Sequence, residues 1–177
     1  MKAISVFENG FRLYADSSVH RSIQPVFLPD VDGGWSVAVC PCVRLSRLGM
    51  HIAEKFAPRY YDSVSAAAVF MPTDSIADPL RAGERYYAMD SAFAPGEWQP
   101  CNDRQTTYRI DFDSRAIAFT ADSVAADKTI AALSSFMTFK MGDILIFPDD
   151  RICAPIAEGS RIKVEINGNQ CLDIKVK

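Results

Sequence analysis

Short runs of hydrophobic residues, many of them alternating with polar ones, dominate the chain and predict a protein built mainly of β-strands. Glycine, proline or aspartate separates the runs, as is typical of turns between strands. Between Thr73 and Gln105, frequent proline and glycine predict a loop with short strands. The strands predicted from this pattern are Ala3–Phe7, Pro25–Leu28, Trp35–Leu45, Ser65–Met71, Thr107–Phe112, Ile144–Phe147, Arg161–Ile166 and Cys171–Val176.

The last two predicted strands show the clearest alternation and indicate a hairpin. Ile162, Val164 and Ile166 share one face of the first of them, and charged residues occupy the other face. Gly168, in an Asn-Gly-Asn sequence between the strands, can adopt the positive φ angle that a tight turn requires. We therefore expect the sequence to end in an antiparallel hairpin with one buried face.

Helical patterns are few. Hydrophobic residues at spacing i, i+3 and i+7 predict one amphipathic helix over Asp127–Met137, with Asp122 or Ser123 as the candidate cap upstream. A second, shorter helix is predicted in the first part of Ile52–Tyr61, because Pro58 limits its length. Together with the strands, this pattern predicts a β-rich α+β fold with few short helices.

Length and charge narrow the class of protein. At 177 residues the chain is predicted to form a single domain over residues 1–177, long enough to bury about 70% of the surface of the unfolded chain. The net charge is −3, from 19 basic and 22 acidic residues, and no two basic residues are adjacent. We therefore expect no nucleic-acid partner, because a run of phosphates requires clustered positive charge.

The longest uncharged stretches are also too short to cross a membrane. They reach eleven residues, as in Gly33–Val43, whereas a spanning helix needs about 20. An acidic residue, Glu8, follows the N-terminus before an apolar signal-peptide run can develop. The sequence therefore predicts no membrane partner and a cytoplasmic location.

Residue types that carry catalysis or bind metals form no strong motif. Neither His20 nor His51 has a second candidate ligand at the spacing of a metal site. Cys40 and Cys42 form a Cys-x-Cys that could hold a soft metal, but on a strand buried thiols are the favoured interpretation. The five cysteines, an odd number at irregular spacing, argue against a disulfide framework. We expect no cofactor.

Three segments nevertheless have a specific pattern. The first, Arg44–Asp62, begins with Arg-Leu-Ser-Arg-Leu-Gly and ends with Arg-Tyr-Tyr-Asp; the second, Ser134–Leu145, contains Lys-Met-Gly-Asp; the third is Glu158–Ile166. In order and separation they resemble segments of the fumarylacetoacetate hydrolase family. The resemblance covers Trp35–Lys177 as the core of the domain, and residues 1–34 match more weakly.

The resemblance implies both a fold and a chemistry. It implies mixed β-sheets rolled around a central cavity, usually in a dimer. Active members of the family hold Mg²⁺ or another divalent cation and cleave carbon–carbon bonds of small oxo-acids, or decarboxylate or hydrate them. Their cation is held by a Glu-x-Glu and an Asp, and a lysine, a Thr-Gly-Thr-Pro turn and a histidine-containing lid complete the site.

This chain departs from the family at the positions of those functional residues. The two glutamates fall on Ala38 and Cys40, and the aspartate falls on Val69. Mg²⁺ prefers hard oxygen ligands, which alanine and valine lack and which a thiol does not supply. The resemblance therefore implies the scaffold of the family without its metal.

Other parts of the implied site differ as well. The lysine position falls on Tyr87, the Thr-Gly-Thr-Pro turn is replaced by Phe-Pro-Asp-Asp at 147–150, and no lid histidine is found near Asn9. The residues predicted to line the pocket are Ala38, Cys40, Val69, Tyr87, Phe147, Asp149 and Asp150.

Three hypotheses about function follow. The first is a non-catalytic pseudo-enzyme that acts as a binding or interaction module, as a homodimer or paired with an active paralogue, with a small-molecule ligand as a further partner. The alternative is a hydrolase- or lyase-type enzyme that acts on a small oxo-acid at a relocated or metal-independent site, for example with Asp149, Asp150 and Arg151. The third is an unrelated function on the same fold, because folds host many functions.

Overall fold

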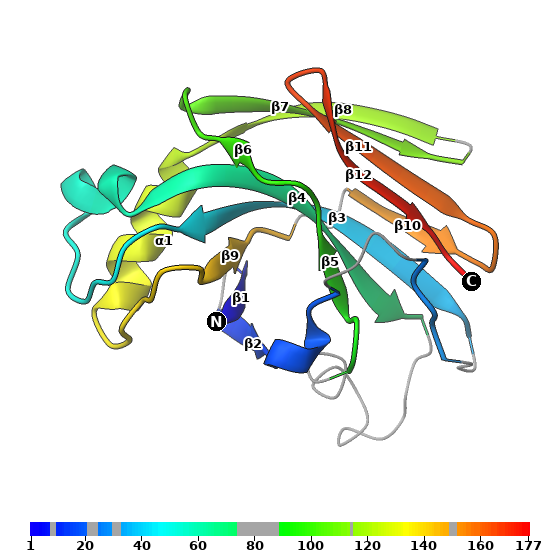
Figure 1. Cartoon of the computed structure of the whole chain (residues 1–177), viewed down its shortest axis with the longest axis horizontal. Helices are drawn as coiled ribbons and strands as arrows, with labels where there is room; N and C mark the ends of the chain where they lie inside the picture. The colour runs from blue at the N-terminus through cyan, green and yellow to red at the C-terminus, as the bar shows by residue number, and fades with distance from the viewer. Residues whose placement is uncertain (8–9, 21–24, 30–32, 74–88, 114, 149–151) are drawn as a thin grey trace.

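A computed structural model describes residues 1–7, 10–20, 25–29, 33–73, 89–113, 115–148 and 152–177. Within these residues the strands form a sheet of eight strands and a sheet of four. The smaller sheet lies across one face of the larger one, and the single α-helix described lies at one end of both (Figure 1). This architecture is the predicted β-rich α+β fold.

The larger sheet is mixed. Its strands follow the order β2-β1-β9-β3-β4-β5, with β10 paired to β3 and β6 paired to β4. The β1–β9 pair is parallel, and the other pairs are antiparallel. The strands are β1 (Ala3–Phe7), β2 (Gly10–Tyr14), β3 (Trp35–Leu45), β4 (Tyr61–Pro72), β5 (Phe93–Pro95), β6 (Gln99–Pro100), β9 (Ile144–Ile146) and β10 (Cys153–Ile156).

The smaller sheet is antiparallel throughout, in the order β12-β11-β7-β8. Its strands are β7 (Gln105–Phe112), β8 (Arg115–Asp122), β11 (Arg161–Ile166) and β12 (Asn169–Lys175). The turn between β11 and β12 places Asn167 at φ +50° and Gly168 at φ +81°. The predicted C-terminal hairpin is confirmed, and three alternate residues of β11, at 162, 164 and 166, are fully buried.

The helix α1 (Val124–Ser134) begins and ends three residues before the predicted bounds. Ser123 holds the N-cap position without a side-chain bond, and the Asp122 Oδ1 accepts a hydrogen bond of 2.9 Å from the Val124 N–H instead. The second predicted helix is a 3₁₀ turn, η2 (Glu54–Arg59), which includes Pro58 instead of ending before it. A short 3₁₀ turn, η1 (Asp16–Ser18), follows β2.

Alternation along β3 divides its side chains between two hydrophobic clusters. Val37 and Val39 face the main core, which fills the space between the two sheets and α1. Ala38 and Cys40 face the opposite side of the large sheet, where β1, β2 and β5 contribute to a smaller cluster. The predicted site residues Ala38 and Cys40 therefore lie on this second side of the large sheet.

Several sequence predictions need correction. Pro25–Leu28 is not a strand: only Val26 forms an isolated parallel bridge, to Val176, because the pairing with the end of the chain extends over this single residue. The sequence pattern missed β2, β8 and β10 altogether, since their alternation is weak or their residues are small.

In the part of the chain that the structure describes, no helix is long and apolar enough to span a membrane.

Candidate functional site

Three of the predicted site residues lie together on the second side of the large sheet. Ala38 on β3 is directly opposite Val69 on β4, and Cys40 is opposite Ala67. Because alternate residues of a strand share a face, Ala38 and Cys40 point to the same side. The structure therefore brings these three positions together on one face of the sheet.

These three side chains are packed and not open to solvent. Their exposed fractions are 4% for Ala38, 0% for Cys40 and 6% for Val69. They belong to a cluster that includes Tyr14 from β2 and Phe93 from β5, whose ring centroids are 4.8 Å apart. Aromatic side chains thus fill space above the three positions.

The donors at this position do not fit a hard divalent cation. Ala38 and Val69 have no side-chain donor atom, and the Cys40 thiol lies 3.8 Å from the backbone oxygen of Ala38 as a weak hydrogen-bond donor. Mg²⁺ normally takes one or more carboxylates together with waters. Among the described residues, no group of three or more His, Cys, Asp or Glu side chains could hold a metal ion.

The other predicted site residues lie elsewhere or outside the described part. Phe147 is partly buried against the main core, and its N–H donates to the Pro41 backbone oxygen at 2.9 Å. Tyr87, Asp149 and Asp150 are outside the described residues. The structure therefore brings three of the seven predicted residues together and places a fourth on the other side of the sheet.

Two further thiols lie near the same face. The Cys171 Sγ of β12 is 3.3 Å from the Ser65 Oγ of β4, and Ser65 is opposite Cys42 in the β3–β4 register. Burial raises the pKa of the Cys42 thiol well above its ordinary value, and burial also raises that of Cys171. Both thiols are therefore protonated at neutral pH and are poor nucleophiles.

A large cavity lies beside this cluster, lined by residues of β5 and the segment after it, of β12 and of β9. Its volume is about 710 Å³, within the usual range of small-molecule sites. Polar groups and apolar side chains both line it. The polar side chains are His20, Arg44, Glu97, Gln170 and Asp173.

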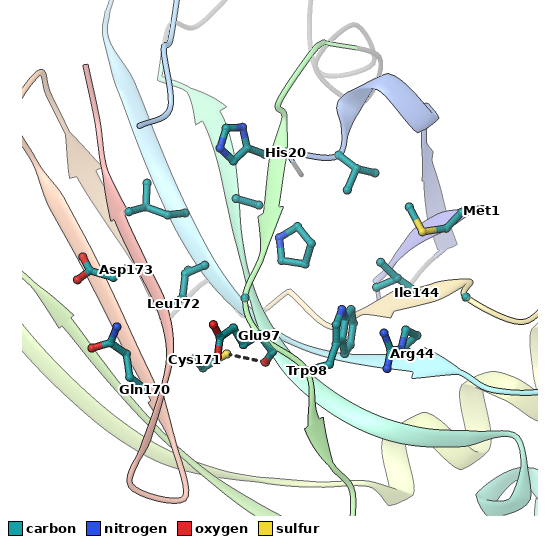
Figure 2. A pocket seen from close by; sticks show the side chains of 16 residues that line it. Met1, His20, Arg44, Glu97, Trp98, Ile144, Gln170, Cys171, Leu172 and Asp173 are labelled. Carbon is teal, nitrogen blue, oxygen red and sulfur yellow. Dashed lines mark hydrogen bonds between the residues drawn. The ribbon is translucent and has the colours of Figure 1, made fainter. Parts of the chain in front are cut away.

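Figure 2 shows that these groups lie on two sides of the cavity. Gln170, Leu172 and Asp173 line the side formed by β12, while Arg44 and Trp98 lie together on the other side, near Ile144. None of the four described residues that the sequence predicted as pocket-lining is among the residues that line this cavity.

Arg44 and Trp98 contact each other at the cavity wall. The Arg44 Cζ lies 5.0 Å from the Trp98 ring centroid, a cation–π contact. Its Nη2 donates a hydrogen bond of 3.2 Å to the Ser63 Oγ, and Ser63 in turn donates to Asp62 Oδ1 at 2.6 Å. The guanidinium is therefore held against the ring at the cavity wall.

Sequence reasoning missed this pair. One signal was present: Arg44 is the only charged residue of β3, and it continues the series 38, 40, 42 on one strand face. A charge in an otherwise uncharged strand can indicate a site. The partner Trp98 could not be found in this way, because it comes from a distant segment that follows β5.

Comparison with known proteins identifies the fold. No family model matches the chain, and neither does any curated protein. Among solved structures, a fumarylacetoacetate hydrolase family protein from Yersinia pestis CO92 superimposes with a TM-score of 0.81 at 15% identity, over 99% of this chain and 91% of that one.

Two other solved structures carry the names of enzymes. Maleylpyruvate hydrolase from Sphingobium sp. SYK-6 has a TM-score of 0.81 at 18% identity, over 99% of this chain and 69% of that one. The 2-hydroxyhepta-2,4-diene-1,7-dioate isomerase from Mycobacterium marinum has a TM-score of 0.83 at 15% identity, over 99% and 73% respectively. The resemblance that the sequence indicated is confirmed at the level of the fold.

Proposed function

We propose that this chain, which has the fold of the fumarylacetoacetate hydrolase family, is a non-catalytic binding or interaction module without the divalent-metal site of that family. The observation that carries the proposal is the packing of Ala38, Cys40 and Val69 into one apolar cluster. A cation at this position would lose its hydration shell and gain no carboxylate in return, which is unfavourable for a strongly hydrated ion.

The chemistry of the neighbouring groups supports the same proposal. The nearby thiols Cys42 and Cys171 have raised pKa values because they are buried, so neither offers a ready nucleophile. Replacement of a hydrated metal site by alanine, cysteine and valine removes polar groups that would otherwise need partners. A chain with this fold can then bind a ligand or a partner without catalysing a reaction.

The proposal includes an assembly and a location. A homodimer, or a pair with an active paralogue, is the assembly that the family resemblance favours. A cytoplasmic location agrees with the cysteines, all five of which are thiols and none of which forms a disulfide. Sedimentation of the purified chain over a range of concentrations tests self-association independently of any ligand.

Calorimetric titration with Mg²⁺ and with Mn²⁺ tests whether the chain lacks a divalent-metal site. We expect no saturable heat for either metal in the wild-type chain. A matched variant, Ala38→Glu/Cys40→Glu/Val69→Asp, restores the three carboxylates and serves as the comparison where it folds. Micromolar binding of either metal by the wild type, lost when Cys40 is replaced by alanine, would contradict the proposal.

One observation favours a different function. The solved structures named above include a hydrolase and an isomerase, so this fold supports catalysis in other chains. On that alternative, the chain acts on a small oxo-acid at a relocated or metal-independent site, with Asp149 and Asp150 as candidate groups.

Assays with acylpyruvates and oxaloacetate, with and without divalent metals, distinguish the non-catalytic module from the enzyme. A non-catalytic module gives no turnover above the background rate with any substrate or metal. Turnover that disappears in Asp150→Asn, but persists in the surface variant Asp103→Asn, would support the enzyme and overturn the proposal of a non-catalytic module.

A further inference from the structure

We propose that the cavity beside β5 binds a small organic carboxylate with an aromatic or apolar body, and that the Arg44 guanidinium, stacked on Trp98, receives the carboxylate group. The inference deepens the binding role proposed above and rests on it. It concerns a position distinct from the Ala38, Cys40 and Val69 cluster, since none of these three residues lines the cavity.

The guanidinium has the geometry of an anion receptor. It is planar and carries five N–H donors, and in the described part of the chain only one hydrogen bond from it is formed, to Ser63. Its Cζ lies over the Trp98 ring, and its other N–H donors make no hydrogen bond among the described residues. A carboxylate matches that edge with two parallel hydrogen bonds.

The position of the guanidinium is fixed before any ligand arrives. Trp98 is partly buried against the second hydrophobic cluster, which anchors the indole ring. On the other side, Ser63 accepts a hydrogen bond from Arg44 and donates one to Asp62. A charged group held between a ring and a hydrogen-bonded hydroxyl loses little conformational entropy on binding.

The rest of the lining favours a hydrophobic body for the ligand. The cavity walls near β5 and β12 include Val19, Ala94, Leu172 and Ile174. A volume of about 710 Å³ accommodates a ring together with its substituents. A ligand with its carboxylate at Arg44 would place its body against these side chains, which offer an apolar wall rather than polar partners.

The charges around the cavity favour a single negative charge over two. Glu97 and Asp173 also line it, and their carboxylates repel an anion. The charge of Asp173 is balanced by Arg161, whose Nε and Nη2 each donate at 2.7 Å, and this ion pair lowers the pKa of Asp173. Arg44 thus faces the cavity together with the carboxylate of Glu97 and lies one hydroxyl away from Asp62, a surrounding that suits a monocarboxylate better than a phosphate dianion.

Titration with benzoate, followed by calorimetry and by ligand-detected NMR with EDTA present, tests the inference. We expect saturable binding in the millimolar range or tighter, as for a small fragment. The neutral isostere benzamide should bind at least about tenfold more weakly, because it cannot make charge-assisted hydrogen bonds with the guanidinium. Inorganic phosphate and benzylamine should not compete with benzoate.

Variants locate the site. Arg44→Gln should weaken benzoate binding at least about tenfold, and Arg44→Lys should weaken it less, because the charge remains but the planar fork is lost. Arg59→Gln is the matched control: Arg59 lies 5.2 Å from the Phe56 ring in the same kind of contact, outside the cavity. The Arg59→Gln variant should bind benzoate with the affinity of the wild type.

Each contrary outcome overturns the inference. Equal affinity for benzoate and benzamide, unchanged binding in Arg44→Gln, or no binding of benzoate would each do so. The comparison of benzoate with benzamide uses only the wild type, so it decides the matter even where Arg44→Gln does not fold. A negative result leaves the non-catalytic module in place, because that proposal is tested by metal binding and turnover.

Discussion

Ala38 and Val69 lie directly opposite each other across the β3–β4 pair, on a face of the sheet that is closed by other side chains. Residues paired in this way have Cβ atoms about 5 Å apart. Polar ligands at these two positions could converge on one ion, whereas the methyl groups present here contact each other and their apolar neighbours. At these two positions the face therefore presents no side-chain donor to an ion.

A single carboxylate introduced at the Ala38 position should destabilise the protein. Ala38→Glu places a charged group at a position that is 4% exposed, where the described neighbours are apolar. We expect the free energy of unfolding in urea to fall by more than about 2 kcal/mol at pH 7, the cost of burying an unpaired polar group.

Ala118→Glu is the control for that substitution. Ala118 lies in β8, an edge strand, and is exposed, so the same change should alter stability by no more than about 0.5 kcal/mol. Equal destabilisation by the two substitutions would show that the Ala38 position is open to water in solution.

The strands that the sequence predicted well are those in which hydrophobic and polar residues contrast strongly. The bounds of β3 and β11 match the prediction, and the contrast in β11 arises from charged residues between buried isoleucine and valine. β8 was missed because it reads Arg-Ala-Ile-Ala-Phe-Thr-Ala-Asp, in which small alanines occupy the exposed positions and weaken the alternation.

The two candidate sites likewise differ in how far the sequence could predict them. The adjacency of Ala38, Cys40 and Val69 followed from a family resemblance and from the strand period, both of which are local to the sequence. The Arg44–Trp98 contact could not be predicted, since it depends on how the segment after β5 folds back over the sheet. Cavity shape is a tertiary property that periodicity does not encode.

Asp143 should contribute strongly to the attachment of the N-terminal strand. It is fully buried, and its Oδ1 and Oδ2 accept hydrogen bonds from the backbone N–H groups of Lys2 and Lys140 at 2.7 and 2.8 Å. The Lys2 Nζ also lies 2.7 Å from Oδ2. Asp143→Ala should lower the free energy of unfolding by about 3 to 5 kcal/mol, because three donors lose their acceptor.

Urea denaturation and amide hydrogen exchange in β1 measure this effect. Asp143→Asn should be less destabilising, because the amide keeps one oxygen acceptor. Asp111→Ala is the surface control, since the Asp111–Arg109 pair at 3.4 Å is exposed and worth about 0 to 1 kcal/mol. The argument fails if Asp111→Ala destabilises the protein as much as Asp143→Ala does.

Gly96 should tolerate no side chain. A Cβ atom at this position would lie 2.6 Å from both the backbone oxygen and the Sγ of Cys171. The close approach allows the Glu97 N–H to donate to the Cys171 oxygen at 2.8 Å, which joins the segment after β5 to β12. We expect Gly96→Ala to lower the free energy of unfolding by about 1 to 3 kcal/mol, the usual cost of overpacking.

A double variant separates the two clashes. Cys171→Ala removes the sulfur but leaves the backbone oxygen, so Gly96→Ala/Cys171→Ala should recover only part of the stability lost in Gly96→Ala. Complete recovery would mean that the thiol alone causes the clash and that the backbone can move. Thermal unfolding of the four proteins gives the required double-mutant cycle.

Tyr61 should make the protein less stable at alkaline pH. Burial raises the pKa of its phenol from 10 to about 12, and its hydroxyl donates a 2.9 Å hydrogen bond to Asp127 Oδ1. The unfolded chain releases this proton above pH 10, whereas the folded chain keeps it up to about pH 12. Stability from Tyr61 is therefore complete below pH 10 and falls by about 1.4 kcal/mol per pH unit from there to the folded pKa.

The variant Tyr61→Phe isolates this effect. At pH 8 it should be less stable than the wild type by about 1 to 3 kcal/mol, because Asp127 loses a buried donor. Other groups whose pKa burial raises, such as Cys42, titrate equally in both proteins and cancel in the difference. Urea denaturation at pH 8, 10 and 11 should show the gap narrowing by about 1 kcal/mol between the last two values, because pH 10 is the pKa of the unfolded phenol and the full slope is reached only above it. A constant gap would mean that the Tyr61 hydroxyl ionises equally in the folded and unfolded chain, and a widening gap that folding lowers its pKa; either result contradicts the prediction.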